Sequence, residues 1–253
     1  MKKVLIKGKG ICKTFSDDTN AVQVLDHVDI DIFEGDFTVI MGASGAGKST
    51  LLYALSGMDN ITGGEVEFKG KKISNLPEKK MAQLRAEEFG FVFQQTHLVS
   101  NLTLLENVAV AGYACRTKAV KDVRERAVHL LSQMYVEGAK NRLPHQVSGG
   151  EAQRAAIARA VINHPDLIFA DEPTGALNKA NSEEVLELMT ELNQNGQSIL
   201  MVTHDIRSAI HGNRILYLED GKILDELNLS VYQEDDRKIR EMRVSDWLSS
   251  LRW

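Results

Sequence analysis

A glycine-rich segment, residues 42–49, constrains the fold of this chain more than any other feature. It fits the pattern G-x-x-x-x-G-K-[ST] at each fixed position, and the glycines of this pattern let successive backbone N–H groups wrap a phosphate chain. The largely apolar run 37–41 before it indicates a buried strand, and residues 49–56 after it indicate a helix. A strand, a glycine-rich turn and a helix in this order predict a P-loop.

The P-loop residues have separate expected roles. The dipole of the helix that begins near Lys48 adds positive potential where an anion sits. We expect Lys48 to reach the β- and γ-phosphates and the Ser49 hydroxyl to bind Mg²⁺. A glycine-rich turn with a chance lysine is the alternative, which the flanking strand and helix disfavour. The residues of this segment expected to contact the nucleotide are Gly42, Ser44, Gly45, Ala46, Gly47, Lys48, Ser49 and Thr50.

Two carboxylates follow a second apolar run, residues 167–170. Asp171, at the strand end, suits Mg²⁺, usually through water. Glu172 is expected to point the other way, because side chains alternate along a strand, and so to orient or deprotonate the attacking water. A helix N-cap followed by a first-turn acid is the alternative. The P-loop upstream favours the catalytic interpretation.

Two more polar residues follow predicted strands. His204 comes shortly after the run 198–202, and Gln94 directly after the run 89–93. Ligands of open α/β sheets gather at the carboxyl ends of the strands. We therefore predict that His204 senses the γ-phosphate, with a purely structural histidine as the alternative. Gln94 by itself is unremarkable.

The alternation of strands and helices predicts an α/β fold with a parallel sheet.

Of the 253 residues, 43% are hydrophobic and 26% charged, ordinary values for a soluble globular protein. The net charge of -5 gives no support to general nucleic-acid binding. No apolar run approaches the roughly 18 residues of a membrane-spanning helix, so we expect another chain to supply any membrane span. Strands are predicted over residues 4–11, 22–32, 37–41, 89–93, 167–170, 198–202 and 215–218, and a strand with a turn over 63–70. Helices are predicted over residues 49–56, 78–88, 148–163, 182–193 and 236–251, and a helical, exposed pattern over about 103–138.

The segment Val147–Glu151, with sequence VSGGE, resembles the signature motif of ABC ATPases. With the P-loop, Gln94, Asp171-Glu172 and His204 in this order, the chain up to about Asp225 is similar to that family. The resemblance implies the P-loop NTPase fold of ABC ATPases: a mixed sheet core, an antiparallel β part and an α-helical subdomain at about 95–163. It also implies a domain boundary, with the ATP-binding domain at 1–225 and a C-terminal helical extension at 226–253.

The resemblance further implies a head-to-tail homodimer with two ATP molecules between the subunits. The P-loop of one subunit then faces the signature segment of the other, so that Ser148, Gly149, Gly150 and Glu151 contact the partner's nucleotide. This segment is also a capping-box pattern, S-x-x-E, and a helix N-terminus with two glycines suits an anion. Ser148 as a cap of its own helix is the alternative, and both interpretations are compatible.

Several site residues take their roles from this resemblance. Phe15 corresponds to the aromatic residue that stacks on adenine, with a core phenylalanine as the alternative. Gln94 joins Ser49 and Asp171 as a magnesium ligand. The expected catalytic residues are Glu172, His204 and Gln94, and the expected cofactors are ATP and Mg²⁺.

More locally, the chain resembles the branch of lipoprotein-releasing, macrolide-exporting, bacitracin-type peptide-resistance and cell-division ATPases. The residues that carry this likeness are Leu84-Arg85, Gly90–Gln94, Leu102–Val108 and Ala170–Leu177. The implied partner is a transmembrane permease, and the implied location is the cytoplasmic face of the cell membrane. Export, extraction or mechanotransmission is the expected function.

Two alternatives remain at this point. The first is a cell-division-type ATPase that gates a wall enzyme through its permease, which shares each of these motifs. The second is a soluble ABC ATPase acting on ribosomes or DNA, which normally shows tandem cassettes, a coiled-coil insertion or a basic patch.

Three residues depart from the family pattern, and a C-terminal helix lies beyond it. Val147 stands in place of the usual leucine, and Glu151 in place of the glutamine common in other branches. Asn178 occupies the usual position of an aspartate in the loop that crosses the dimer interface. The predicted C-terminal helix either packs on the parent domain or forms a docking surface. The residues expected to share a face there are Ile239, Met242 or Arg243, Trp247, Leu248 and Leu251.

Overall fold

The computed structural model describes residues 2–16, 20–115 and 119–251. The chain forms two compact units. The first contains residues 1–81 and 193–253, and the second contains residues 82–192. Neither the predicted boundary at 225 nor the predicted helical subdomain at 95–163 is tested by this division, and both stay predictions.

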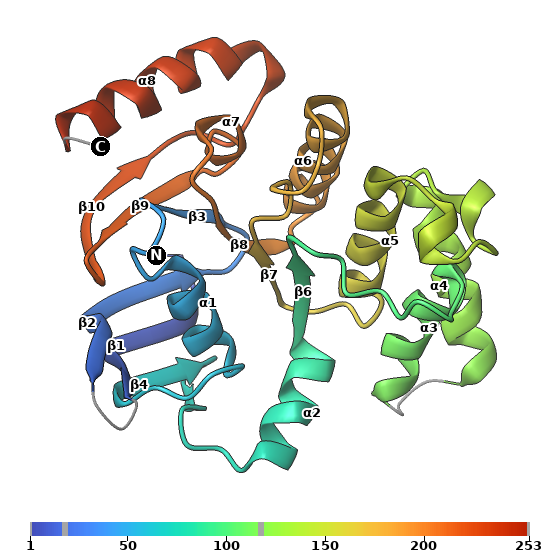
Figure 1. Ribbon diagram of the computed structural model, residues 1–253, viewed down its shortest axis with the longest axis horizontal. Helices are drawn as coiled ribbons and strands as arrows, with labels where there is room; N and C mark the ends of the chain where they lie inside the picture. The colour runs from blue at the N-terminus through green and yellow to red at the C-terminus, as the bar shows by residue number, and fades with distance from the viewer. Residues whose placement is uncertain (1, 17–19, 116–118, 252–253) are drawn as a thin grey trace. The chain divides into compact units, whose positions relative to one another are not determined.

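An antiparallel sheet forms one part of the first unit, with the order β2-β1-β4-β5 (Figure 1). Its main component is a pair of long strands, β1 (Val4–Ser16) and β2 (Ala21–Phe33). Burial roughly alternates along both strands, as expected when a sheet buries one face. The shorter strands are β4 (Gly63–Phe68) and β5 (Lys71–Lys72). This sheet is the antiparallel β part that the sequence predicts.

A mixed sheet forms the other part of the first unit. Strand β3 (Phe37–Met41) lies between β8 (Ser198–Val202) and β9 (Arg214–Glu219) and is parallel to both. Strand β10 (Lys222–Asn228) pairs antiparallel with β9. Every residue of β3 and β8 is buried, which explains their continuous apolar sequence. The predicted α/β fold with a mixed sheet is confirmed, whereas β10 was not predicted because its side chains are mostly polar and exposed.

The C-terminal helix α8 (Arg237–Ser250) packs within the first unit, through a face that the sequence predicts only in part. Ile239 and Met242 are 54% and 59% exposed, whereas Arg240, Val244 and Leu248 are buried. The guanidinium of Arg240 donates hydrogen bonds to the carbonyl oxygens of residues 210, 212 and 230. A buried arginine is tolerated when its donors are paired, so apolar spacing alone predicted the burial of Leu248 correctly but wrongly placed Ile239 and Met242 on the packed face.

The second unit contains a parallel strand pair and most of the helices (Figure 1). The strands are β6 (Phe89–Phe93) and β7 (Leu167–Asp171). The helices are α3 (Leu104–Ala114), α4 (Val120–Gln133) and α5 (Gly149–Val161), with short 3-10 turns at Glu137–Ala139 and Pro144–Gln146. The bounds of α2 (Glu78–Glu88) and α6 (Lys179–Gln194) extend past those of the unit.

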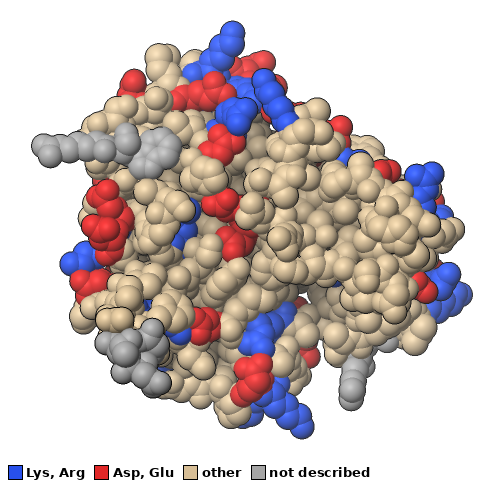
Figure 2. Space-filling model, in the orientation of Figure 1, with Lys and Arg blue, Asp and Glu red and all other residues tan. Residues whose placement is uncertain are grey.

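The surface and the helices carry two further findings. Acidic and basic side chains are interspersed on the face drawn in Figure 2. Within residues 2–16, 20–115 and 119–251, no helix combines the length and the apolar character that crossing a membrane requires.

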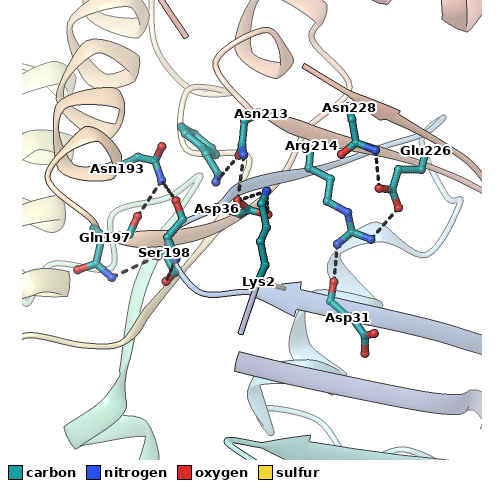
Figure 3. Close-up of polar contacts among 12 residues, drawn as sticks. Lys2, Asp31, Asp36, Asn193, Gln197, Ser198, Asn213, Arg214, Glu226 and Asn228 are labelled. Atoms are coloured by element: carbon teal, nitrogen blue, oxygen red, sulfur yellow. Dashed lines mark hydrogen bonds and ion pairs between the residues drawn. The ribbon is translucent and has the colours of Figure 1, made fainter. Parts of the chain in front are cut away.

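A buried polar network fixes the start of β3 (Figure 3). The side chain of Asp36 is nearly buried and accepts hydrogen bonds from Lys2 Nζ at 2.7 and 2.9 Å. Asn213 donates from Nδ2 to the same carboxylate at 2.9 Å and accepts the backbone N–H of Phe37 at 2.7 Å. Because β3 leads into the P-loop, this network anchors the strand at the end opposite the loop.

We expect Asn213→Ala to lower the free energy of unfolding by about 1–3 kcal/mol, because the substitution leaves the backbone N–H of the buried Phe37 without its acceptor and removes one of the donors to the Asp36 carboxylate. Urea unfolding of both proteins measures the difference. Asn228→Ala is the matched control, since its exposed amide donates only to Glu226, and we expect a change within about 0.5 kcal/mol. Equal effects of the two substitutions would contradict the anchoring role of Asn213.

Candidate functional site

The P-loop is held tightly between β3 and helix α1 (Lys48–Ser56). A Cβ atom at Gly42 would lie 2.1 Å from the carbonyl oxygen of Leu218 in β9. Gly47 is the N-cap of α1 with φ of 99°, and a Cβ there would lie 2.9 Å from the carbonyl oxygen of Val24. Both positions therefore require glycine, one for close approach and the other also for its left-handed backbone.

The start of α1 has the properties of an anion site. Its N-cap provides no side-chain hydrogen bond to the first N–H groups of the helix, and such groups attract anions. Lys48 is only 7% exposed, and its ammonium donates to the carbonyl oxygens of Gly42 at 2.8 Å and Ala43 at 2.9 Å. A buried cation therefore lies within the loop, at the positive end of the helix dipole.

His204 lies at the same edge of the mixed sheet as the P-loop. In the parallel pair β3–β8, Ile40 is the partner of Val202, and the backbone N–H of Thr203 donates to Ile40 at 3.1 Å. Continued by two residues, this register sets His204 level with Gly42. Thr203 is buried but His204 is exposed. The first unit therefore brings together the two features that the sequence predicts at its phosphate edge.

Phe15 lies at the end of β1, paired with Val22 of β2. Its side chain is 48% exposed, so the alternative of a core phenylalanine is wrong. The ammonium of Lys13 lies 4.7 Å from the ring centroid and also contacts Asp59 at 2.6 Å. An exposed ring at a hairpin end is available for stacking, and that role stays a prediction.

The second unit brings Gln94 together with the two carboxylates. In the parallel pair β6–β7, Phe93 is the partner of Asp171, so Gln94 and Glu172 follow at matching strand ends. The turn after β7 approaches Gln94 closely, because a Cβ atom at Gly175 would lie 2.9 Å from its Nε2. A larger residue at position 175 would displace the glutamine side chain.

The expected alternation of Asp171 and Glu172 does not hold. Strand β7 ends at Asp171, and Glu172 has φ of 44°, in the left-handed region. Side chains alternate only while the backbone is extended, so the direction of Glu172 does not follow from strand geometry. A left-handed non-glycine residue costs about 1–3 kcal/mol and is enriched at active sites.

The signature segment forms the predicted capping box at the start of α5. The Ser148 Oγ accepts the backbone N–H of Glu151 at 3.2 Å, and the Glu151 carboxylate accepts the backbone N–H of Ser148 at 2.8 Å. The hydrogen bond from the Ser148 backbone, together with that from its side chain, lowers the pKa of Glu151 from its ordinary value. Ser148 and Gly149 remain exposed at this helix end.

Asn178 caps the next helix, α6. Its Oδ1 accepts the backbone N–H of Asn181 at 3.0 Å, and its carbonyl oxygen accepts the backbone N–H of Ser182 at 2.9 Å. Asparagine and aspartate are both strong N-cap residues. The departure from the family pattern therefore keeps the helix cap and changes only the charge.

One buried polar residue next to these strand ends is absent from the sequence prediction. The Gln153 side chain, on α5, is 1% exposed and donates to the carbonyl oxygens of Phe93 at 2.9 Å and Pro173 at 2.7 Å. A glutamine in an alanine-rich helix gives no signal of such contacts, because they depend on the packing of the helix against both strand ends.

A P-loop on a buried parallel strand, with a histidine at the same sheet edge and a capped SGGE helix, defines a nucleotide-binding protein of the P-loop class. Residues 25–175 match the family model described as ABC transporter. The chain belongs to the ABC transporter family, as the sequence predicts.

The similar curated proteins are macrolide exporters. The macrolide export ATP-binding/permease protein MacB of Wolinella succinogenes is 44% identical over 224 residues, which cover 88% of this chain and 34% of that protein. MacB of Pasteurella multocida is 37% identical over 253 residues, which cover 100% of this chain and 38% of that protein. The chain thus spans little more than a third of the length of these relatives.

Solved structures of ABC cassettes have the same fold. The ATP-binding cassette MJ0796, in a dimeric post-hydrolysis state bound to ADP and Pi, is 38% identical with a TM-score of 0.84 and covers 90% of this chain and 100% of its own. CbiO1 of Clostridium perfringens, part of the transporter complex CbiONQ, is 25% identical with a TM-score of 0.79 and covers 90% of this chain and 89% of its own.

Proposed function

We propose that this chain binds and hydrolyses ATP and thereby drives a transmembrane permease. The observation that carries the proposal is Lys48, a buried cation inside a glycine loop at the start of α1. This arrangement suits the β- and γ-phosphates of a nucleotide. The likeness to a cassette whose structure holds ADP and Pi supports the same chemistry.

We also propose that a magnesium ion is bound together with the nucleotide. Ser49, Gln94 and Asp171 offer hydroxyl, amide and carboxylate oxygens, the donors that Mg²⁺ prefers. In the described ranges of the chain, no three His, Cys, Asp or Glu side chains form a metal-binding group. A site with few protein ligands suits Mg²⁺, which usually keeps waters and substrate phosphates in its shell. Neutralisation of phosphate charge is the chemistry that the ion supplies when bound.

The hydrolytic roles fall on residues at strand ends. We assign Glu172 to orient or deprotonate the attacking water, His204 to contact the γ-phosphate and Phe15 to stack on adenine. The Glu172 turn and Gln94 lie together in the second unit, and His204 lies at the P-loop edge in the first. Proton transfer by a positioned carboxylate typically contributes a factor of about 10²–10⁴ to a rate.

A head-to-tail homodimer completes the proposal. The exposed start of α5 presents Ser148 and Gly149 with their backbone N–H groups at a helix N-terminus, which suits the phosphates of an ATP bound to the partner subunit. MJ0796, which is 38% identical, is a dimer in its ADP- and Pi-bound structure.

The permease partner and the direction of transport rest on the relatives. The MacB proteins named above are ATP-binding/permease proteins for macrolide export. We therefore favour an exporter or extractor over the cell-division-type alternative, with the chain at the cytoplasmic face of the membrane. Co-purification of this chain with a transmembrane permease tests the partnership, and loss of ATP-dependent macrolide or peptide efflux in cells lacking the chain tests the direction.

We expect Lys48→Ala to weaken ATP binding at least about tenfold, because a charged hydrogen bond contributes about 1.5–3 kcal/mol. Isothermal titration calorimetry with Mg-ATP measures the affinity. Lys69→Ala, an exposed lysine of the first unit, is the control and keeps the wild-type affinity. An unchanged ATP affinity of the Lys48→Ala variant would contradict the proposed role of Lys48 in nucleotide binding.

We expect Glu172→Gln to reduce steady-state hydrolysis at least about 100-fold while ATP binding survives, because the amide keeps the shape but cannot accept the proton. The same variant should form a dimer that depends on Mg-ATP, because without hydrolysis the ATP stays bound between the two subunits. Phosphate release and light scattering with and without nucleotide are the measurements. A turnover equal to that of the wild type, or a dimer that forms equally well without nucleotide, would refute these assignments.

We expect Asn178→Asp to change the turnover or the Hill coefficient by less than about tenfold, or about 1.4 kcal/mol. The cap of α6 survives in this variant, because aspartate caps helices as well as asparagine does. Turnover with the permease present, together with thermal unfolding, separates the two effects. A loss of hydrolysis of about 100-fold or more without loss of stability would show that hydrolysis requires the side-chain amide of Asn178.

A further inference from the structure

We propose that Gln153 is a positioning residue that couples the signature helix to the catalytic strand ends of its own chain. The inference rests on the proposed function, since it concerns the residues assigned there to water activation and magnesium binding. It names a side chain that has no assigned role in that function.

The contacts of Gln153 join three segments that are distant in sequence. From helix α5, its Nε2 donates to the carbonyl oxygen of Phe93, the residue before Gln94. The same nitrogen donates to the carbonyl oxygen of Pro173, the residue after Glu172. The buried amide of Gln153 therefore holds the backbone at the carboxyl ends of β6 and β7, next to the proposed catalytic residues Gln94 and Glu172.

A second side chain of α5 holds the loop that follows Gln94. Arg159 donates from its guanidinium to the carbonyl oxygens of Thr96 at 2.6 Å and His97 at 2.8 Å. Burial lowers the pKa of this arginine from its ordinary value. The segment 93–97 is thus attached to α5 at both ends, and a shift of the helix along its axis must move this segment.

We expect such a shift of α5 to begin at the N-terminal end of the helix. The helix begins at the exposed Ser148 capping box, which the proposed dimer places against the partner's ATP. A helix moves as a rigid element, so binding at its first turn is felt at Gln153, little more than one turn further along. The carbonyl oxygens of Phe93 and Pro173 follow because both share the same donor.

We expect loss of the Gln153 hydrogen bonds to lower the rate of hydrolysis more than the affinity for ATP. Gln153 touches neither the P-loop nor Phe15 in any hydrogen bond described above, so ATP binding should survive its replacement. Misplacement of a catalytic group by about 1 Å costs up to about 100-fold in rate. We therefore expect the change to fall on kcat and on the magnesium requirement.

Asn163 offers a matched control. Its side-chain amide also donates from one nitrogen to two main-chain carbonyl oxygens, those of Ala86 at 3.0 Å and Ala111 at 2.9 Å. It lies just past the other end of α5 and contacts none of the motif segments in these bonds. Loss of this amide tests what a purely structural anchor contributes.

The test compares Gln153→Met and Gln153→Glu with Asn163→Leu and Asn163→Asp in the full chain. The methionine and leucine variants remove the donors without adding charge, and the acidic variants keep the shape. For Gln153→Met we expect kcat to fall at least about tenfold with the KM for ATP within about threefold, and the Mg²⁺ concentration for half-maximal rate to rise. For Asn163→Leu we expect kcat within about twofold at equal loss of thermal stability.

Hydrogen exchange gives a readout that needs no activity. We expect faster amide exchange in segments 94–97 and 172–175 of Gln153→Met, and wild-type exchange there in Asn163→Leu. Wild-type kcat, magnesium dependence and exchange in a folded Gln153→Met protein would overturn the inference, as would equal losses of kcat in both methionine and leucine variants. A wild-type chain without ATPase activity would instead count against the proposed function, and the exchange data would still decide whether Gln153 holds the two segments.

Discussion

Burial of β3 between β8 and β9 is the constraint on which the nucleotide site depends. Each edge of β3 is hydrogen-bonded to a parallel neighbour, and each of its side chains is inaccessible to solvent. The strand therefore has one position in the sheet. Its carboxyl end delivers the chain into the P-loop, where Gly42 approaches β9 so closely that only a glycine fits. Its amino end is fixed by the buried Asp36 and the half-buried Asn213.

The second unit uses the same principle for a different set of groups. The parallel register of β6 and β7 sets Gln94 beside the Asp171-Glu172 pair, and α5 is attached to both strand ends through Gln153. The helix that starts with the signature segment is consequently part of the support of Gln94 and the Glu172 turn, to which we assign catalytic roles. In the proposed dimer, this support would link the two ATP sites, because α5 begins at the segment assigned to the partner's ATP and holds the strand ends of its own chain.

Polar groups inside the fold explain where sequence patterns were a poor guide. Arg240 is buried because three carbonyl oxygens accept its hydrogen bonds, so the packed face of the C-terminal helix includes Arg240 beside the predicted Leu248 and leaves out Ile239 and Met242. Glu172 leaves the extended conformation at the end of β7, so strand alternation does not describe it. The local periodicity fails for Arg240 because carbonyl oxygens of distant segments accept its hydrogen bonds. It fails for Glu172 because the backbone there is no longer extended.

The sequence by itself determined the fold class, the family and most of the element bounds. Strands 37–41, 89–93 and 198–202 follow from largely apolar runs, and helix 78–88 follows from its charged sequence. Both signals are local. The motif residues were also evident, because phosphate binding requires glycines, a lysine and a helix start within a few positions. The tertiary structure decided which side chains support them. The contacts of Gln153 with Phe93 and Pro173 depend on segments brought together by packing, and no spacing along the chain encodes a distance between them.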